Sequence, residues 1–260
     1  MPKATDVKLI ACDLDGTLRP ADQNSIPEEN LRAIERAGQA GILFCPATGR
    51  TFHSTCGLIG DLPRKCCCIT ENGGTVYAPG GIPVAERTFD REMTLEICRH
   101  ILSFPDNHLV MTGRDTVFVL RGDDDFADFL RDIVFERVLR IDSPEEVTVP
   151  LTKLTAFGGN TETMFRQLSE GWTDRCNVAI AGDCVVDYTM ADKGTGVEDI
   201  CRHLHIPLEN VMAIGDNYND LPMLECVGFP VLMEGAAEPL HERYPHTCAT
   251  VAEAIESLLK

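Results

Sequence analysis

The feature that most constrains this chain is the stretch LIACDLDGTL at residues 9–18, an apolar run of strand length that ends in two aspartates. In a strand, positions i and i+2 face the same side, so Asp13 and Asp15 point in one direction. Like charges placed so close disfavour each other's ionised form. A chain that ends a buried strand in this pair needs something that lets the two carboxylates coexist.

The first third of the chain alternates short apolar runs with amphipathic segments. We expect strands at 7–13, 42–47 and 66–70, and helices at 25–38 and 51–60. Ser25 is expected to cap the first of these helices, with Glu28 completing a capping box. Apolar strands that alternate with amphipathic helices predict an α/β fold with a parallel, doubly wound sheet.

The pattern changes after residue 70. A hairpin is expected over 71–88, followed by strands in pairs with intervening helices, which predict an α+β module with an antiparallel sheet. The helices expected there are 91–104, 124–137 and 162–169, and the strands are 108–112, 115–121, 151–157, 176–181 and 184–190. From about residue 193 the first pattern returns, with a helix at 195–204, strands at 211–216 and 229–233, and a terminal helix. The simplest architecture is a core made from both ends of the chain, with a smaller module inserted between them.

Charge and composition narrow the classes of function. The 260 residues carry a net charge of −18, which argues against broad binding to nucleic acid or to anionic membranes. No apolar run approaches the length of a membrane span, and the stretch MPKATDVKLIACDL has no apolar core of a secretory signal. The twelve cysteines include no C-x-x-C pair. We expect buried, reduced thiols and a cytoplasmic setting; no protein partner can be inferred from the sequence.

Polar residues gather where the predicted strands end. In a doubly wound sheet, ligands bind beyond the carboxyl ends of the strands. The sequences at these positions combine carboxylates, hydroxyls, glycines and cations: DLDGT at 13–17, ATGR at 47–50, ENGG at 71–74 and GDNYND at 215–220, with DKG at 192–194 before the returning helix. Several such clusters, all at predicted strand ends, indicate one composite site.

A divalent cation would let the carboxylates coexist. Mg²⁺ prefers oxygen ligands and is commonly bound by a few carboxylates together with substrate phosphate. Asp13 and Asp216 come from different strands and can converge on one ion. Thr48 and Lys193 can hold phosphate oxygens, with backbone N–H groups from glycine-bearing turns such as that of Gly49. A carboxylate can also accept a phosphoryl group, so one aspartate of the first pair can be the nucleophile while its neighbour handles protons.

Other polar residues leave two interpretations open. Asn72 either contacts substrate or forms the turn that its two following glycines imply. Arg50 either contacts substrate or is a surface residue at the start of a helix. Arg114, Arg121 and Lys153 are cations of the inserted module that could meet an anionic group, and for each of them the solvated surface is the favoured interpretation.

The motifs DLDGT, TGR, DKG and GDNYND, in this order, resemble the four motifs of the haloacid dehalogenase (HAD) superfamily. The long insert between the second and third motifs resembles the C2 cap of its Cof-type (IIB) sugar-phosphatase branch, and ITENGG and LTKLTAFGG are also similar to that branch. The resemblance covers essentially the whole chain. It implies a Rossmann-like parallel-sheet core at 1–82 and 188–260, with a C2-type α+β cap at 83–187. Two departures are Arg19, where an apolar residue is common, and Glu234, near the position of a usual asparagine.

The resemblance also implies a role for each motif residue. Asp13 would attack phosphorus, and Asp15 would protonate the leaving oxygen and then activate water. Thr48 would bind phosphoryl oxygens and Lys193 would neutralise charge. Mg²⁺ would be held by the residues Asp13, Asp15 (through its backbone carbonyl) and Asp216, with Asn219 and Asp220 orienting the metal ligands.

The implied activity is a Mg²⁺-dependent phosphatase that hydrolyses a small phosphorylated metabolite, such as a sugar phosphate, through an aspartyl-phosphate intermediate. A sugar phosphomutase of the same branch is the alternative. A non-catalytic phospho-aspartate switch is a third hypothesis. It is disfavoured because a proton-handling group at Asp15, beside the phosphoryl acceptor, implies turnover.

Overall fold

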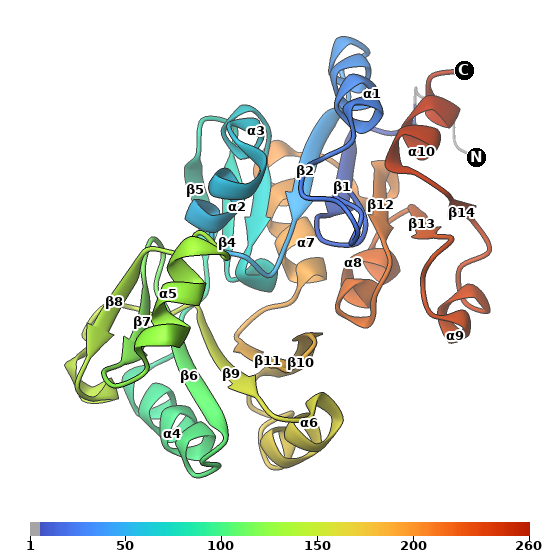
Figure 1. Ribbon diagram of the computed structural model, residues 1–260. Coiled ribbons are helices and arrows are strands. Elements are labelled where there is room, and N and C mark those ends of the chain that lie inside the picture. Colours follow the sequence, from blue (N-terminus) through green and yellow to red (C-terminus); the bar gives the residue numbers. More distant parts are fainter. Residues whose placement is uncertain (1–5) are drawn as a thin grey trace.

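The computed structural model describes residues 6–260 and contains two β-sheets with helices packed around them (Figure 1). Residues 1–5, part of the stretch in which we expect no secretory signal, lie outside the described residues. The larger sheet has eight strands in the order β14-β13-β12-β1-β2-β3-β4-β5. The smaller sheet has six strands in the order β10-β11-β9-β6-β7-β8. The α/β class with a parallel-sheet core is confirmed.

The larger sheet is built from both ends of the chain. Its strands are β1 (Leu9–Asp13), β2 (Leu43–Ala47), β3 (Cys68–Thr70), β4 (Thr75–Ala78), β5 (Ile82–Glu86), β12 (Val211–Gly215), β13 (Phe229–Met233) and β14 (Thr247–Cys248). Strand β1 lies between β2 and β12 and runs parallel to both. Only β4 and β5 add antiparallel pairs at one edge.

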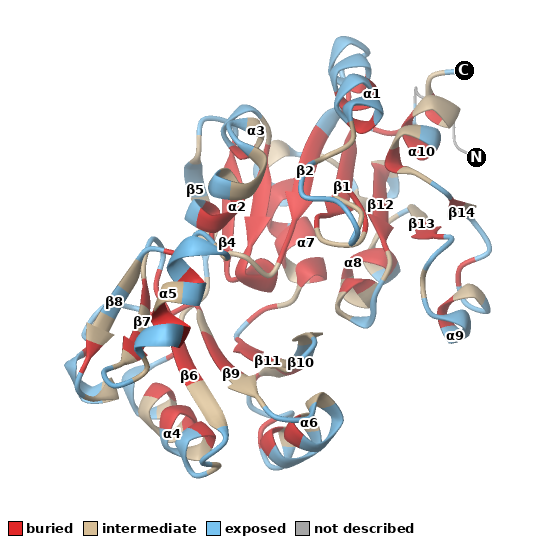
Figure 2. Ribbon diagram, viewed as in Figure 1, coloured by how far each residue is buried: buried red, intermediate tan, exposed pale blue. Residues whose placement is uncertain are grey.

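Helices cover both faces of this sheet. They are α1 (Glu28–Gln39), α2 (Phe52–Ile59), α3 (Leu62–Lys65), α7 (Lys193–Leu204), α8 (Leu221–Cys226), α9 (Glu238–His241) and α10 (Val251–Leu258). Within β1, Ile10 and Cys12 pack in the cluster that includes α1 and α10, whereas Leu9 and Ala11 pack in the cluster that includes α7 and α8. This alternation shows why β1 is apolar along its whole length: both of its faces are buried (Figure 2).

The smaller sheet forms a layer of its own with three helices (Figure 1). Its strands are β6 (Asn107–Thr112), β7 (Val117–Leu120), β8 (Val138–Ile141), β9 (Lys153–Gly158), β10 (Asn177–Gly182) and β11 (Val185–Thr189), and its helices are α4 (Arg91–Leu102), α5 (Asp124–Asp132) and α6 (Thr161–Ser169). Neighbouring strands are antiparallel except β7 and β8. Short 3₁₀ turns cover Glu71–Gly73, Pro144–Glu146, Leu208–Asn210 and Tyr218–Asp220.

The two places where the chain crosses between the sheets differ from the expected boundaries. The expected boundary after residue 82 falls within β5, which pairs with β4 through Glu86. The expected boundary after 187 falls within β11, which pairs in the smaller sheet through Thr189. We propose that the cap is the stretch between these two strand ends. Both strands continue across the positions at which the family resemblance implied a boundary.

Three local expectations are wrong. The first helix has Pro27 at its N-cap, without a side-chain cap, so Ser25 does not cap it and the capping box with Glu28 is absent. The helix expected over 124–137 ends at Asp132. Strand β8, which follows it, was not predicted. Phe135 has φ +63°, and this left-handed residue prevents the helix from continuing.

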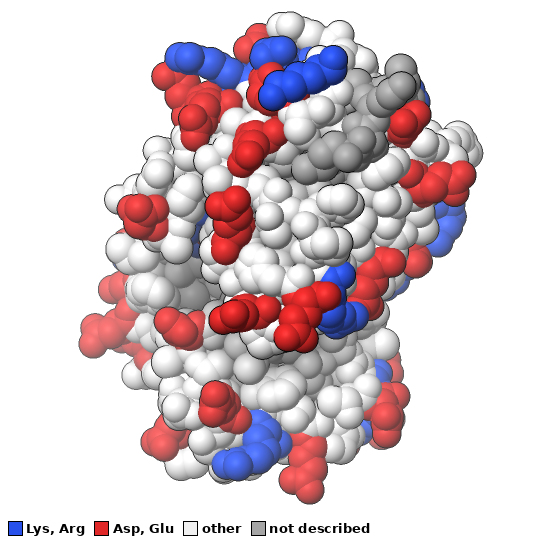
Figure 3. All heavy atoms as spheres, turned by 90° about the vertical axis from the view of Figure 1, so that its right-hand side faces the viewer, with Lys and Arg blue, Asp and Glu red and all other residues white. Residues whose placement is uncertain are grey.

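The acidic surface and the buried cysteines are as the composition predicted. Acidic side chains are spread over the face shown in Figure 3, with basic side chains in small groups. Most of the cysteines are buried, including Cys12, Cys45 and Cys68, and burial raises the pKa of these thiols. Within residues 6–260, none of the helices has the length and apolar character that crossing a bilayer requires.

Candidate active site

The carboxyl ends of β1, β2, β3 and β12 lie together at one edge of the larger sheet because these strands run parallel. A cavity of about 380 Å³ lies at this edge, between the two sheets. The core residues that line it include seven of the expected site residues: Asp13, Asp15, Thr48, Gly49, Arg50, Asn72 and Asn219. The topology therefore brings the expected groups to one place.

Three carboxylates form a cluster that could hold a metal ion. One oxygen from each of Asp13, Asp216 and Asp220 lies within 4.8 Å of the others. The Thr17 hydroxyl donates a hydrogen bond to Asp216 Oδ1 at 2.6 Å and fixes that side chain. Gly16 has φ +96°, and a Cβ there would lie 2.7 Å from Asp216 Oδ2. The glycine of DLDGT thus permits the close approach of the two aspartate-bearing loops.

Lys193 is buried beside this cluster, at the first position of α7. Its ammonium group donates to Asp13 and to Asp220 Oδ1, the latter at 2.6 Å. Burial alone would lower the pKa of Lys193, but the charges of Asp13 and Asp220 raise it overall. Asp192 caps the helix by accepting a hydrogen bond from the Thr195 N–H at 2.7 Å, which sets where α7 begins.

The carboxylates outnumber the cation that neutralises them. Burial, followed by the charge of Asp220, raises the pKa of Asp13 well above its ordinary value, and burial also raises the pKa of Asp216. Asp220 is saturated by protein donors, because its Oδ2 accepts from the backbone N–H groups of Asp216 and Asn217, both at 3.0 Å. The excess negative charge and the hard oxygen donors fit Mg²⁺. In this arrangement Asp13 and Asp216 are the candidate ligands, and Asp220 orients the loop.

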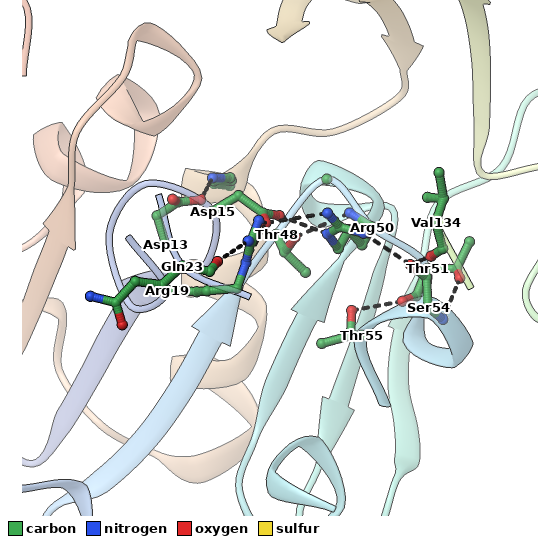
Figure 4. A network of polar contacts seen from close by, with 12 residues as sticks. Asp13, Asp15, Arg19, Gln23, Thr48, Arg50, Thr51, Ser54, Thr55 and Val134 are labelled. Carbon is green, nitrogen blue, oxygen red and sulfur yellow. Dashed lines mark hydrogen bonds and ion pairs between the residues drawn. The ribbon is translucent and has the colours of Figure 1, made fainter. Parts of the chain in front are cut away.

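Asp15 lies between two arginines (Figure 4). Arg50 Nε donates to Asp15 Oδ2 at 2.7 Å, and Arg19 donates to Asp15 Oδ1 through two of its nitrogens. Burial tends to raise the pKa of Asp15, but the hydrogen bonds and charges of Arg50 and Arg19 outweigh it and hold this pKa below its ordinary value. The Asp15 carboxylate thus contacts arginines, whereas the Asp13 carboxylate contacts Lys193, although the two residues are only two positions apart in the sequence.

Thr48, Gly49 and Asn72 line the cavity. The Thr48 hydroxyl accepts a hydrogen bond from the Arg50 N–H at 3.2 Å. A Cβ at Gly49 would lie 3.2 Å from the amide of Asn72, so these two residues are in close contact. Asn72 has φ +53°, as in the predicted turn, and its Nδ2 donates to Asp187 Oδ2 at 3.1 Å. Asn72 therefore forms the predicted turn and also lines the cavity, and its contact with substrate stays a prediction.

The remaining candidates from the sequence fall into two groups, those on the surface and those that line the cavity. Arg114 and Arg121 lie on the surface, paired with Glu86 and Asp142, as the favoured interpretation predicted. Lys153 is the exception, because it lines the cavity and donates to the Gly49 carbonyl at 2.8 Å. Glu234 is exposed and does not line the described cavity.

Two carboxylates line the cavity on the side of the smaller sheet and were not among the residues predicted from the sequence. Asp187 is buried in β11, where it accepts from Thr155 Oγ1 at 2.5 Å and lies 3.4 Å from Lys153 Nζ. Glu136 is buried after α5 and accepts from Thr51 Oγ1 at 2.6 Å. An acidic residue inside the apolar run CVVDYT is a signal that could have identified Asp187. The sequence around Glu136 gives no such signal, because the segment was expected to be helical.

Comparisons with known proteins show a family match and a shared fold. The family model of haloacid dehalogenase-like hydrolases matches residues 10–257. An Escherichia coli protein named 5-amino-6-(5-phospho-D-ribitylamino)uracil phosphatase is 24% identical, covering 88% of this chain and 86% of its own length. An E. coli HMP-PP phosphatase is 28% identical, covering 92% of this chain and 88% of its own length. The solved structure of a HAD subclass IIB sugar phosphatase shares the fold, with a TM-score of 0.80, 22% identity and coverage of 96% of this chain and 98% of that one.

Proposed function

The chain belongs to the haloacid dehalogenase-like hydrolase family, and on that premise we propose that it is a Mg²⁺-dependent phosphatase acting on a small phosphorylated metabolite through an aspartyl-phosphate on Asp13. Two relatives that match most of its length are named phosphatases. A sugar phosphate or a similar phosphomonoester is the proposed substrate. The proposal also includes a cytoplasmic setting, which the buried thiols support.

The observation that carries this proposal is the buried contact of Lys193 with Asp13 and Asp220, next to Asp216 and open to the cavity through Asp13. A solvated surface would not hold three carboxylates and an ammonium group in this arrangement. Mg²⁺, bound by Asp13, Asp216 and the Asp15 carbonyl, would stabilise negative charge on the transferring phosphoryl group. Lys193 holds the Asp13 carboxylate in place and adds positive charge at the same point.

The other residues bind the phosphoryl group and move protons. The Thr48 hydroxyl and the backbone of Gly49 line the cavity, where they can donate to phosphoryl oxygens. In the first step Asp13 attacks phosphorus, and Asp15 gives a proton to the leaving oxygen. In the second step Asp15 takes a proton from the water that hydrolyses the acyl-phosphate.

Arg19 and Arg50 bear on the position of Asp15. Both guanidinium groups hold its carboxylate at the edge of the cavity, in the ionised form that the second step requires as a base. For the first step Asp15 needs a proton, so these contacts have to loosen when substrate phosphate enters. We propose that phosphate oxygens compete with Asp15 for the guanidinium groups, which gives Arg19 a positioning role in place of an apolar residue.

A phosphate-release assay tests the proposal. Purified protein with Mg²⁺ is expected to release phosphate from p-nitrophenyl phosphate and from members of a metabolite panel that includes 5-amino-6-(5-phospho-D-ribitylamino)uracil, and EDTA is expected to abolish the release. Absence of turnover across the panel would count against a phosphatase. A requirement for a bisphosphate activator, with total ester phosphate conserved, would instead identify a phosphomutase.

The two aspartates should behave differently when each is changed to asparagine. Asp13→Asn is expected to abolish phosphoryl transfer, with kcat reduced by about 10³-fold or more, because the nucleophile is removed. Asp15→Asn should still allow phosphorylation of Asp13 by an ester with a good leaving group, because such a leaving group needs no proton. Acid-quench labelling measures the phospho-enzyme, and the exposed Asp142→Asn is the matched control. Equal loss of labelling in both variants would overturn the assignment.

A further inference from the structure

The cavity extends beyond the phosphoryl site to a wall formed by the smaller sheet and α5. Its apolar part includes Val110, Val117, Leu130 and Phe157, and the Phe129 ring lies 5.9 Å from the Phe157 ring, centroid to centroid. A substrate whose phosphate sits at Asp13 places its leaving group against this wall. The apolar surface there fits one face of a ring and gives a strongly hydrated chain little to contact.

The charged groups on this side of the cavity are unbalanced. Lys153 is committed to the Gly49 carbonyl and to Asp187, and Glu136 adds a second carboxylate whose hydroxyl donor is Thr51. On the core side, Arg19 and Arg50 are both committed to Asp15. Each cation that lines the described cavity is thus already paired, whereas the acidic groups on the leaving-group side exceed the basic ones by one. A second anionic group on the substrate would meet like charge.

One buried hydrogen-bond acceptor beside the cavity has no donor. Asn72 uses its Nδ2 for Asp187, but its Oδ1 has no partner among the described residues. Asn72 is 4% exposed and lines the cavity. A buried acceptor without a donor is costly, and a ligand N–H or O–H would satisfy it.

From these three observations we propose that the leaving group of the substrate combines an apolar ring face with amino or ring N–H donors and carries no second anionic group. This inference rests on the proposed function, since it takes the phosphoryl site at Asp13 as its starting point. The ring face lies on the apolar wall, and the donors meet Glu136 and Asn72 Oδ1. We expect bisphosphates and sugar acids to be poor substrates, because Lys153 already contacts Asp187 and the second anionic group would face the carboxylates of Glu136 and Asp187.

Three esters that share a ring and a leaving oxygen test the proposal. Pyridoxamine 5′-phosphate carries an amine, pyridoxine 5′-phosphate a neutral hydroxymethyl group and 4-pyridoxic acid 5′-phosphate a carboxylate at the same ring carbon. We expect kcat/KM to fall in that order, by about tenfold or more between the amine and the carboxylate. An equal or reversed order overturns the proposal, as does turnover of p-nitrophenyl phosphate with none of the three esters hydrolysed.

Glu136→Gln tests the residue behind the selectivity. It replaces the carboxylate with a neutral amide of similar size, and the ratio of kcat/KM between the amine and carboxylate esters is expected to fall by about fivefold or more. The exposed cap variant Glu145→Gln should leave that ratio unchanged. An unchanged ratio in Glu136→Gln contradicts the charge argument.

Glucosamine 6-phosphate tests the ring face, because it has an amine without an aromatic ring. Its kcat/KM should be at least about threefold lower than that of pyridoxamine 5′-phosphate, and equal values would overturn the ring-face part of the proposal.

Binding separates failure of this inference from failure of the proposed function. Dissociation constants of the three esters are measured by titration calorimetry in Asp13→Asn protein, which needs no turnover. If the unaltered enzyme hydrolyses neither p-nitrophenyl phosphate nor any of the three esters but the order of binding holds, the phosphatase proposal fails and the subsite stands. If phosphate is released from p-nitrophenyl phosphate but the three esters do not bind in the expected order, the phosphatase proposal stands and the subsite proposal fails.

Discussion

Glu71 is an ionisable residue that the active site does not use, although it precedes Asn72. It is fully buried, with φ +48°, and its Oε2 accepts a hydrogen bond from Thr70 Oγ1 at 2.7 Å. Its Oε1 has no partner among the described residues, and the same is true of the hydroxyl groups of Thr75 and Tyr77. Burial raises the pKa of Glu71 to about 8. The folded protein therefore keeps this carboxyl group neutral at neutral pH.

This shift makes the free energy of unfolding depend on pH. The folded-state pKa lies above the unfolded one, so the contribution of Glu71 is fully present below about pH 4.5 and is lost as pH rises toward 8. Glu71→Gln should remove up to about 1.4 kcal/mol per pH unit of that slope. Urea unfolding at several pH values between 5 and 8 measures it, with exposed Glu29→Gln as control. Parallel curves for Glu71→Gln and the unaltered protein would show that Glu71 ionises normally.

At the scale of an element, helix α7 is placed by the close approach of its first turn to α8. A Cβ added at Gly194 would lie 2.4 Å from the backbone oxygen of Pro222, which cannot move aside without shifting α8. Lys193 precedes this glycine and donates to Asp13 and Asp220. The position of Lys193 thus depends on the close contact between Gly194 and Pro222, which leaves no room for a side chain at residue 194.

Gly194→Ala is expected to displace the start of α7. We predict a loss of about 1–3 kcal/mol in the free energy of unfolding from overpacking, together with a fall in kcat because Lys193 moves away from Asp13. Gly38→Ala in α1 is the matched control, since a Cβ there has nothing within 4 Å. Chemical denaturation and phosphate release measure the two effects. A variant as stable and as active as the control would contradict the packing argument.

The elements of the core could be predicted because their signals are local. Strand β1 is apolar throughout, since both of its faces are buried, and each polar motif follows a strand whose end is fixed by that burial. Segment 134–136 could not be predicted in this way. Its apolar residues continue the helical spacing of α5, and only the left-handed Phe135 shows that the chain turns toward α2. The same difference holds for the candidate site. Its residues on the larger sheet could be predicted from local motifs, whereas the place of Glu136 depends on its contact with Thr51, which is distant in the sequence.

At the scale of the whole molecule, segment 134–136 links the cap to the core. Thr51 Oγ1 donates to Glu136, Ser54 Oγ donates to the Val134 carbonyl, and a Cβ at Gly57 would lie 2.7 Å from Phe135 Cβ. All three contacts come from α2 and its cap. Together with the contact of Lys153 with Gly49, they connect the two sheets on either side of the cavity.

Gly57→Ala should weaken this link. The added methyl group pushes Phe135 away, so we expect amide hydrogen exchange across 134–136 to become about tenfold faster or more, and KM for metabolite esters to rise. Hydrogen-exchange mass spectrometry and steady-state kinetics measure these changes. Gly38→Ala again serves as the helical glycine control. Unchanged exchange in Gly57→Ala would mean that the link does not hold the cap in place.

The order of strands in the larger sheet has a consequence for synthesis. Strand β1 pairs with β2 on one side, but on the other side Leu9 pairs with Val211, which the ribosome adds only after the whole cap. The cap sheet, by contrast, consists of one continuous stretch of chain from β6 to β11. During translation the cap can complete its own sheet while one edge of β1 is still unpaired. The backbone N–H and C=O groups along that edge of β1 therefore need protection from wrong pairing until β12 emerges.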